Sequence, residues 1–144
     1  MASGSKIGNI TFDCADPTAL SHFWSDVLDY PYTEMPPGMK EQLLANGVTE
    51  EEFGDRGVAE DPTGVGPRLF FQKVPEGKVV KNRVHLDIAS TPGRRPTPEE
   101  LESEKDRVVS LGATVLHKVD QSWGGYPERH FVMRDPEGNE FCIQ

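Results

Sequence analysis

Long apolar segments and cysteine pairs are both missing from this sequence of 144 residues. No apolar run approaches the roughly 20 residues of a transmembrane helix, so we expect no membrane-spanning segment. The only cysteines, Cys14 and Cys142, do not make a disulfide framework or a zinc motif. The first residues also lack the charged and apolar regions of a signal peptide. We therefore expect a cytoplasmic protein with reduced thiols.

Basic residues are few. Lys and Arg number 15 against 24 Asp and Glu, which gives a formal net charge of −9 at pH 7. This balance argues against nucleic acid or an anionic membrane as the main partner, because both attract basic surfaces. Hydrophobic residues make up 35% of the chain, a proportion compatible with a globular protein. A chain of this length buries roughly two-thirds of its unfolded surface, so we expect one domain, 1–144.

Short segments of alternating polar and apolar residues recur along the chain, a pattern typical of strands with one buried face. The predicted strands cover residues 7–14, 68–74, 83–88, 113–118, 130–134 and 140–144. A short strand is also expected at 30–34, and a flexible loop at 122–127. The predicted apolar face carries Ile10, Phe12, Leu69, Phe71, Val84, Leu86, Ile88, Phe131, Met133, Phe141 and Ile143. The predicted polar face carries Asn9, Thr11, Asp13, Gln72, Arg83, His85, Asp87, Arg134, Glu140 and Cys142.

Two amphipathic helices are indicated by their end signals. The first begins after Asp16, a favourable N-cap residue, and ends before Tyr30. The second begins after Thr97, where Glu100 completes a capping box, and ends at Gly112. We expect both helices to cover the apolar face of the sheet.

An acidic segment, residues 39–61, interrupts the first half of the chain. Its part from 41 to 61 holds seven acidic side chains and a single basic one, Arg56. It has two interpretations: a solvated surface excursion, or a lid over a pocket.

The two halves of the chain repeat the order strand, helix and several short strands. Residues 9–12 align with residues 85–88, and each stretch alternates polar and apolar side chains. The simplest prediction is an α+β fold with two βαβββ modules, 6–76 and 82–144. If the sheet is cupped, its polar face lines a cavity with convergent polar groups, as in small-molecule sites.

Four stretches carry a resemblance to a known family. They are Asp13-Cys-Ala-Asp-Pro17 followed by Phe23-Trp24, Arg68-Leu-Phe-Phe-Gln-Lys-Val-Pro-Glu76, Asn82-Arg-Val-His-Leu-Asp87, and Asp135-Pro-Glu-Gly-Asn-Glu-Phe-Cys142. The chain resembles the glyoxalase-like branch of the vicinal oxygen chelate superfamily. The resemblance implies two βαβββ modules in a cupped mixed sheet around a cavity, with helices on the outer face. It also implies a homodimer.

The resemblance further implies four positions at which metal-dependent members hold a divalent cation. They fall on Asn9, on Gln72 or the adjacent Phe71, on His85, and on Cys142. Only His85 keeps a good ligand type, since amide oxygens are weak neutral ligands and a thiolate suits zinc rather than oxygen-loving metals. We therefore expect no metal cofactor. The alternative is a metal-dependent glyoxalase, dioxygenase or thiol transferase that uses His85.

The candidate ligand-binding residues are Asn9, Gln72, His85, Trp123 and Cys142. His85 is either a catalytic base, since its ordinary pKa suits proton transfer, or a structural histidine of the sheet. Asp87 is two residues on, and such positions on a strand lie about 7 Å apart, so we do not expect a His–Asp pair. Trp123 is either a stacking platform for a ligand or an exposed loop aromatic.

The functional hypothesis is a glyoxalase-like protein that binds a small molecule. It is either a metal-independent lyase, isomerase or hydratase, or a binder that sequesters a compound. Two alternatives stay open: the metal-dependent enzyme described above, and an interaction module that docks through the acidic segment.

Overall fold

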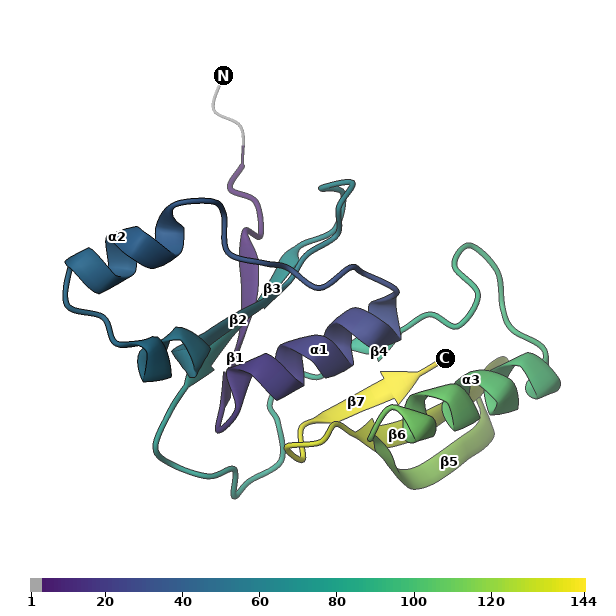
Figure 1. Cartoon of the computed structure of the whole chain (residues 1–144). Helices are drawn as coiled ribbons and strands as arrows, with labels where there is room; N and C mark the ends of the chain where they lie inside the picture. Colours follow the sequence, from purple (N-terminus) through teal and green to yellow (C-terminus); the bar gives the residue numbers. More distant parts are fainter. Residues whose placement is uncertain (1–3) are drawn as a thin grey trace. The chain divides into compact units, whose positions relative to one another are not determined.

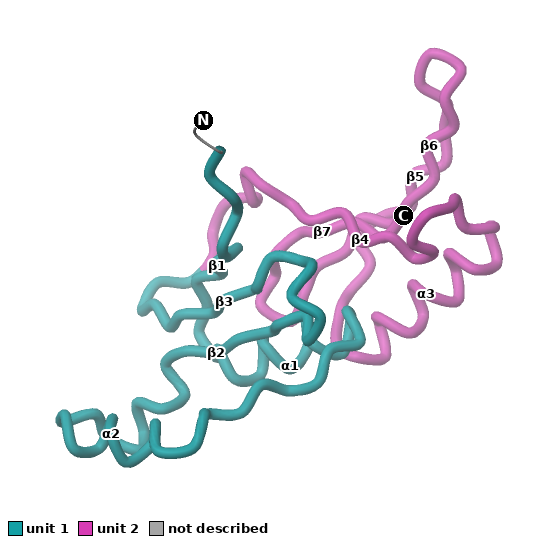
Figure 2. Tube along the Cα trace, turned by 90° about the horizontal axis from the view of Figure 1, so that it is seen from above, with its two compact units in different colours: residues 1–77 teal, residues 78–144 magenta. Residues whose placement is uncertain are grey.

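The computed structural model of the protein describes residues 4–144. The chain divides into two compact units, residues 1–77 and 78–144, which are coloured separately in Figure 2. Within the described residues, no helix has the length and apolar character needed to cross a membrane.

The first unit holds a sheet of three strands (Figure 1). Its elements in chain order are β1 (Asn9–Cys14), α1 (Pro17–Leu28), α2 (Met39–Ala45), the 3₁₀ helix η1 (Glu50–Asp55), β2 (Arg56–Ala59) and β3 (Arg68–Lys73). β3 is the central strand, with β1 parallel on one side and β2 antiparallel on the other.

Helix α1 covers the apolar face of this sheet. Its N-cap forms as predicted, because the side chain of Asp16 accepts a hydrogen bond from the backbone N–H of Ala19. The ring of Phe12 on β1 lies 5.5 Å from the ring of Trp24 on the helix and 5.2 Å from the ring of Phe71 on β3. These aromatic contacts tie β1, β3 and α1 into one core.

The second unit holds a sheet of four strands with helix α3 on one face (Figure 1). Its elements are β4 (Asp87–Ile88), α3 (Pro98–Ser110), β5 (Thr114–Trp123), β6 (Tyr126–Arg134) and β7 (Glu140–Ile143), arranged in the order β4-β7-β6-β5. The side chains buried in this unit include Leu101, Val108, Phe131, Met133, Phe141 and Ile143. The capping box of Thr97 and Glu100 is present, and Gly112 takes a positive φ of 123° after the helix.

The predicted α+β class with mixed sheets is therefore confirmed, while several segments differ from expectation. Residues 30–34 form no strand, so the first unit has three strands. Strand β2, inside the acidic segment, was not predicted. Most of the strand expected at 83–88 is irregular, and only Asp87 and Ile88 pair with β7. Val84, expected on the apolar face, is consequently exposed.

The predicted loop at 122–127 is instead the end of a long β5–β6 hairpin. Trp123 pairs with Tyr126, and the two-residue turn between them is Gly124-Gly125. Both glycines have positive φ, 56° and 86°, the conformation that the tightest hairpin turns require. A glycine pair that suggested flexibility thus closes an ordered hairpin.

The turn that precedes β7 forms as predicted. The buried carboxylate of Asp135 accepts hydrogen bonds from the backbone N–H groups of Glu137 and Asn139 and from the Asn139 side chain. Gly138 has a φ of 88° and completes the turn. This network sets the direction in which β7 leaves the turn, and so fixes which of its residues face away from α3.

Candidate functional site

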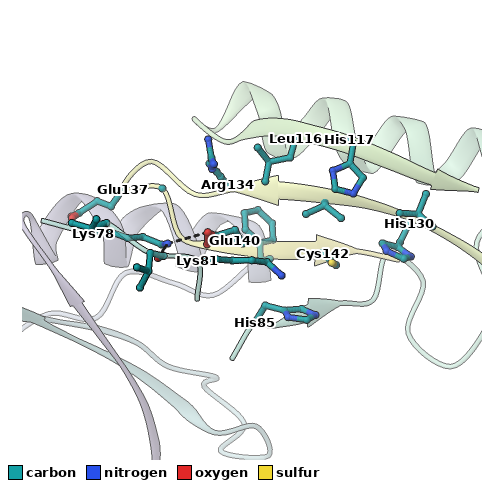
Figure 3. A pocket seen from close by; sticks show the side chains of 16 residues that line it. Lys78, Lys81, His85, Leu116, His117, His130, Arg134, Glu137, Glu140 and Cys142 are labelled. Atoms are coloured by element: carbon teal, nitrogen blue, oxygen red, sulfur yellow. Dashed lines mark hydrogen bonds and ion pairs between the residues drawn. The ribbon is translucent and has the colours of Figure 1, made fainter. Parts of the chain in front are cut away.

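The second unit has a pocket of about 680 Å³ on the sheet face opposite α3 (Figure 3). Strand alternation brings the polar residues of β6 and β7 to this face, because Val132 pairs with Cys142 and Arg134 pairs with Glu140. The polar and charged residues that line the pocket are Lys78, Lys81, His85, His117, His130, Arg134, Glu137, Glu140 and Cys142. The predicted division of this sheet into an apolar and a polar face therefore accounts for the position of the pocket.

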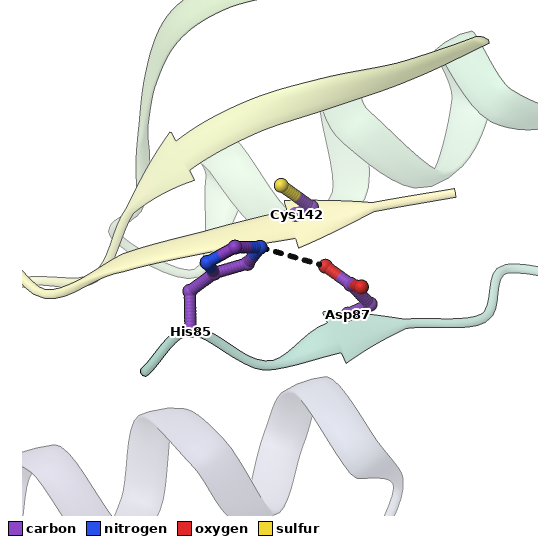
Figure 4. A group of neighbouring side chains, drawn as sticks. All are labelled: His85, Asp87 and Cys142. Carbon is purple, nitrogen blue, oxygen red and sulfur yellow. Dashed lines mark ion pairs between the residues drawn. The ribbon is translucent and has the colours of Figure 1, made fainter. Parts of the chain in front are cut away.

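His85, Asp87 and Cys142 form a compact cluster beside the pocket (Figure 4). Nε2 of His85 lies 3.4 Å from Oδ1 of Asp87, and one ligand atom from each of the three residues lies within 4.8 Å of the others. The separation of about 7 Å, from which a tight dyad was judged unfavourable, does not hold for these two side chains. That separation assumed an extended strand, whereas regular pairing begins only at Asp87, and the irregular backbone before it lets the two side chains converge.

The thiol of Cys142 is held in its protonated form. Burial raises its pKa to about 11, and the nearby negative charge and hydrogen bond of Asp87 act in the same direction. The positive charge of Lys81 acts in the opposite direction. Cys142 is only 7% exposed, and a buried, protonated thiol is not an activated nucleophile.

A short segment, residues 78–82, is fastened over one end of the pocket by Glu140, and we refer to it as the strap. The Glu140 carboxylate accepts a hydrogen bond from Nζ of Lys78 at 2.9 Å and one from the backbone N–H of Asn82 at 3.3 Å. Lys78 also donates to the carbonyl of Val80. Burial acts to raise the pKa of Glu140, but these hydrogen bonds outweigh it and leave the pKa below its ordinary value. Glu140 is therefore an ionised, structural carboxylate.

Four further residues of the lining are basic. Lys81 and Arg134 form no ion pair among the residues that the structure describes, and His117 and His130 extend the basic side of the pocket. The alternation of side chains along β6 could have identified His130, because it lies an even number of residues from Arg134 and therefore shares its face. This signal in the sequence was overlooked. His117 depends on a bulge between Val115 and His117, which no pattern in the sequence reveals.

The other predicted site residues lie outside this pocket. Gln72 lines a cavity of the first unit and donates to Oδ1 of Asp13, while Oδ1 of Asn9 accepts from Nε of Arg68 at the other end of the β1–β3 pair. Trp123 sits at the tip of the β5–β6 hairpin and is 71% exposed. Their roles in ligand binding stay predictions. The structure brings together two of the five, His85 and Cys142.

The His85, Asp87 and Cys142 cluster also offers a set of metal ligands. Imidazole nitrogen, carboxylate oxygen and thiolate sulfur are donors that zinc accepts, and three protein ligands leave a position open for substrate. The set fits such an ion in donor type. Binding requires loss of the thiol proton from Cys142, whose pKa of about 11 makes that loss costly until the ion is present.

Comparison with known proteins places this geometry in a family. The family model of the glyoxalase-like domain matches residues 9–144. No curated protein matches the chain.

Solved structures share the fold at low sequence identity. A glyoxalase/bleomycin resistance protein/dioxygenase family enzyme from Burkholderia phytofirmans is 16% identical, with a TM-score of 0.63 and coverage of 96% of this chain and 97% of the other. A mutant of the fosfomycin resistance protein FosX from Listeria monocytogenes is 12% identical, with a TM-score of 0.63 and coverage of 100% and 90%. A possible glyoxalase from Bacillus cereus is 15% identical, with a TM-score of 0.58 and coverage of 98% and 99%.

Proposed function

Because the chain belongs to the glyoxalase-like domain family, we propose that the pocket of its second unit binds a small organic anion. The observation that carries the proposal is the charge of the lining. Six basic side chains, Lys78, Lys81, His85, His117, His130 and Arg134, surround the cavity, with Glu137 and Glu140 as the acidic ones. With histidines counted as neutral, as they are in the chain's net charge of −9, the lining has three cations, Lys78, Lys81 and Arg134, against these two acids.

The basic groups are unequal in what they offer a ligand. Lys78 is neutralised by its ion pair with Glu140, whereas Lys81 and Arg134 form none among the described residues. Hydrogen bonds from such cations to a carboxylate or phosphonate are roughly twice as strong as neutral ones. Lys81 and Arg134 therefore supply the affinity for an anion.

One structural neighbour supports this class of ligand. The FosX structure was solved with Mn(II) and 1S,2S-dihydroxypropylphosphonic acid, a small organic anion. At 12% identity the likeness concerns the fold, so the neighbour supports the proposal by analogy and the charge of this pocket carries it.

The His85 imidazole adds a route to catalysis at the same pocket. It is positioned to accept a proton from a bound ligand, and the carboxylate of Asp87, 3.4 Å away, stabilises the imidazolium that results. Removal of a proton next to a carbonyl or carboxylate is the first step of lyase and isomerase reactions. If no such step occurs, the same pocket sequesters its ligand.

Thermal-shift measurements test the binding step. Acetate, malonate and methylphosphonate serve as probes, and acetamide and malonamide serve as uncharged counterparts. We expect at least one anion to raise the melting temperature of the wild type, with a smaller rise in Lys81→Met. Lys6→Met, at an exposed lysine of the first unit, is the matched control. Equal shifts from amides and anions, or an equal loss in the control, would overturn the proposal.

Deuterium exchange tests the catalytic step. An anion that binds is incubated with the protein in D₂O, and NMR follows replacement of its carbon-bound hydrogen. Exchange that disappears in His85→Asn while binding persists identifies a lyase or isomerase. Binding without exchange identifies a sequestering protein.

The metal-dependent alternative is favoured by one observation, the His85, Asp87 and Cys142 cluster. These residues would hold a zinc-like ion, which supplies a Lewis acid that polarises substrate oxygens. Elemental analysis of protein purified without chelators separates the candidates. Stoichiometric metal that is lost in Cys142→Ser supports the alternative, and its absence from wild-type protein that binds anions supports the metal-independent function.

A further inference from the structure

We propose that the second unit contains a further binding site, for a small phosphate monoester, on the side of its sheet that faces α3. The site is a crevice of about 640 Å³, formed by the loop between β4 and α3, the first turn of α3 and the first half of β6. We call it the arginine crevice, after Arg94, Arg95 and Arg129 in its lining. Its volume falls in the range of roughly 300 to 1,000 Å³ typical of small-molecule pockets. The inference does not depend on the function proposed for the pocket on the opposite face.

The crevice exists because the sheet extends past the helix that covers it. On the side of β6 that faces α3, Met133 and Phe131 are buried, and the next residue on that side towards the hairpin turn is Arg129. Helix α3 begins at Pro98, and its first buried residue, Leu101, forms a wall of the crevice. The β5–β6 hairpin projects from the rest of this unit (Figure 2). The core therefore ends at Phe131, and an arginine occupies the next position on that side.

The three arginines determine the charge of the crevice. Arg94 and Arg95 come from the loop before α3, and Arg129 comes from β6. The acidic residue of the lining is Glu128, but strand alternation directs its side chain to the face opposite Arg129. There its carboxylate accepts a hydrogen bond from the side chain of Gln121 on β5. On β6, the charged group that faces the crevice is therefore a guanidinium.

Two of the guanidinium groups are positioned by ion pairs. Nη1 and Nη2 of Arg94 both donate to the carboxylate of Glu100. Nε of Arg129 lies 3.5 Å from Oδ1 of Asp120, its cross-strand neighbour on β5. A guanidinium carries five N–H donors in a rigid fork, so each pair leaves donors for a ligand. Because these side chains are already oriented, binding an anion costs them little conformational freedom.

Arg95 supplies the positive charge that these pairs leave over. Its side chain forms no ion pair within residues 4–144. Pro96 follows it, and a residue before proline is restricted to extended backbone, which limits the directions that the Arg95 side chain can take. Arginine binds phosphate through two parallel N–H···O bonds, which are roughly twice as strong as bonds between neutral groups. A phosphate group offers three acceptor oxygens, so it uses more of the available donors than a carboxylate does.

The apolar part of the lining indicates what accompanies the phosphate. Ala89, Pro96, Leu101 and Pro127 contribute carbon surface to the crevice. A bare phosphate ion would leave this surface in contact with water, whereas an ester with a compact apolar body covers it. The ligand class is therefore a phosphate monoester of a small apolar alcohol or phenol.

Isothermal titration calorimetry in a buffer without phosphate tests this site. Phenyl phosphate is the probe, and benzoate and benzyl alcohol are its carboxylate and uncharged counterparts. We expect saturable binding of phenyl phosphate to the wild type, tighter than that of benzoate, and an affinity at least about tenfold weaker in Arg95→Met. Arg83→Met is the matched control, because Arg83 is an exposed arginine of the same unit that lines neither cavity. His130 lines both cavities and is therefore left unchanged.

Lys81→Met separates the arginine crevice from the pocket on the opposite face. Binding that persists in Lys81→Met and weakens in Arg95→Met supports the inference, as does the loss of a different one of two binding events in each variant. Binding that weakens in Lys81→Met and is unchanged in Arg95→Met overturns the inference and leaves the proposed function standing. No saturable binding, an equal loss in Arg95→Met and Arg83→Met, or equally tight binding of benzoate also overturns it. Arg95 is exposed, so its variant should keep the wild-type circular dichroism.

Discussion

Replacement of Glu140 by glutamine tests whether one buried carboxylate holds the strap on the second unit. Glu140 is 6% exposed and joins the ammonium of Lys78 and the N–H of Asn82 to β7. Glutamine has nearly the same shape and can still accept from Asn82. It cannot neutralise Lys78, whose side chain is 23% exposed, so a partly desolvated cation loses its counter-charge.

The size of the effect follows from that exposure. A hydrogen bond to a charged group contributes about 1.5 to 3 kcal/mol, and contact with water screens part of it. We therefore expect Glu140→Gln to lose about 1 to 2 kcal/mol of unfolding free energy at pH 7. With a urea m-value of about 2 kcal/mol per molar, the middle of the usual range, the midpoint falls by roughly 0.5 to 1 M. Far-UV circular dichroism during a urea titration measures this unfolding midpoint.

The pH dependence of this stability loss distinguishes removal of the Glu140 charge from a change in the shape of its side chain. The pKa of Glu140 in the fold lies below its ordinary value of 4.5, so the ionised group stabilises the fold above that pH. This stabilisation is lost as the pH falls through the folded-state pKa. The difference between wild type and Glu140→Gln should thus be full at pH 7 and shrink at pH 3. An undiminished difference at pH 3 would refute the ionic explanation.

Two neighbouring lysines provide the control. Lys78→Met breaks the ion pair, whereas Lys81→Met removes a lysine of the same strap that has no ion pair among the described residues. We expect the first substitution to destabilise the protein and the second to leave its unfolding midpoint nearly unchanged. Equal destabilisation by both would show that the strap is held by packing of its lysines.

Three other predictions concern positions with defined surroundings. Gly57→Ala should lower stability by about 1 to 3 kcal/mol in urea unfolding, because its added Cβ would lie 2.6 Å from the backbone oxygen of Pro17. Thr97→Ala removes the N-cap of α3 and should lose about 0.5 to 2 kcal/mol in the same assay, whereas Thr33→Ala at an exposed loop position serves as the comparison. Asp87→Asn removes one cause of the raised pKa of Cys142, so iodoacetamide should alkylate this thiol faster at pH 9, as followed by mass spectrometry, and a slower reaction would contradict the assigned cause.

The elements that the sequence predicted correctly are those with a local cause. Asp16 and Thr97 cap helices through bonds within three residues, and Asp135 organises its own turn. The alternation of polar and apolar residues along the strand also assigned Phe131 and Met133 to the buried face and Arg134 to the opposite face. Such features depend on residues that are adjacent in the chain, so a single sequence contains them.

The features that were missed depend on contacts between distant segments. β2 is recognisable only through its pairing with β3, and its Gly57 is explained by the close approach of α1. The contact between His85 and Asp87 arises where β4 stops pairing with β7. For the candidate site, the sequence identified His85 and Cys142 and held an overlooked signal for His130, while Lys81 and His117 became apparent from the folded sheet.

The difference between the two units explains why related topologies offer different cavities. In each unit, the first strand lies parallel to the last, and the last pairs antiparallel with the strand before it: β1 with β3 and β2, and β4 with β7 and β6. The second unit adds β5 at the edge, whose His117 contributes to a basic pocket. The first unit has no counterpart of β5. Its chain uses the residues between α1 and β2 for α2 and η1, which contribute apolar and charged side chains to a different cavity. Replacement of an edge strand by α2 and η1 thus changes which residues line the cavity, while the pairing of the remaining strands is retained.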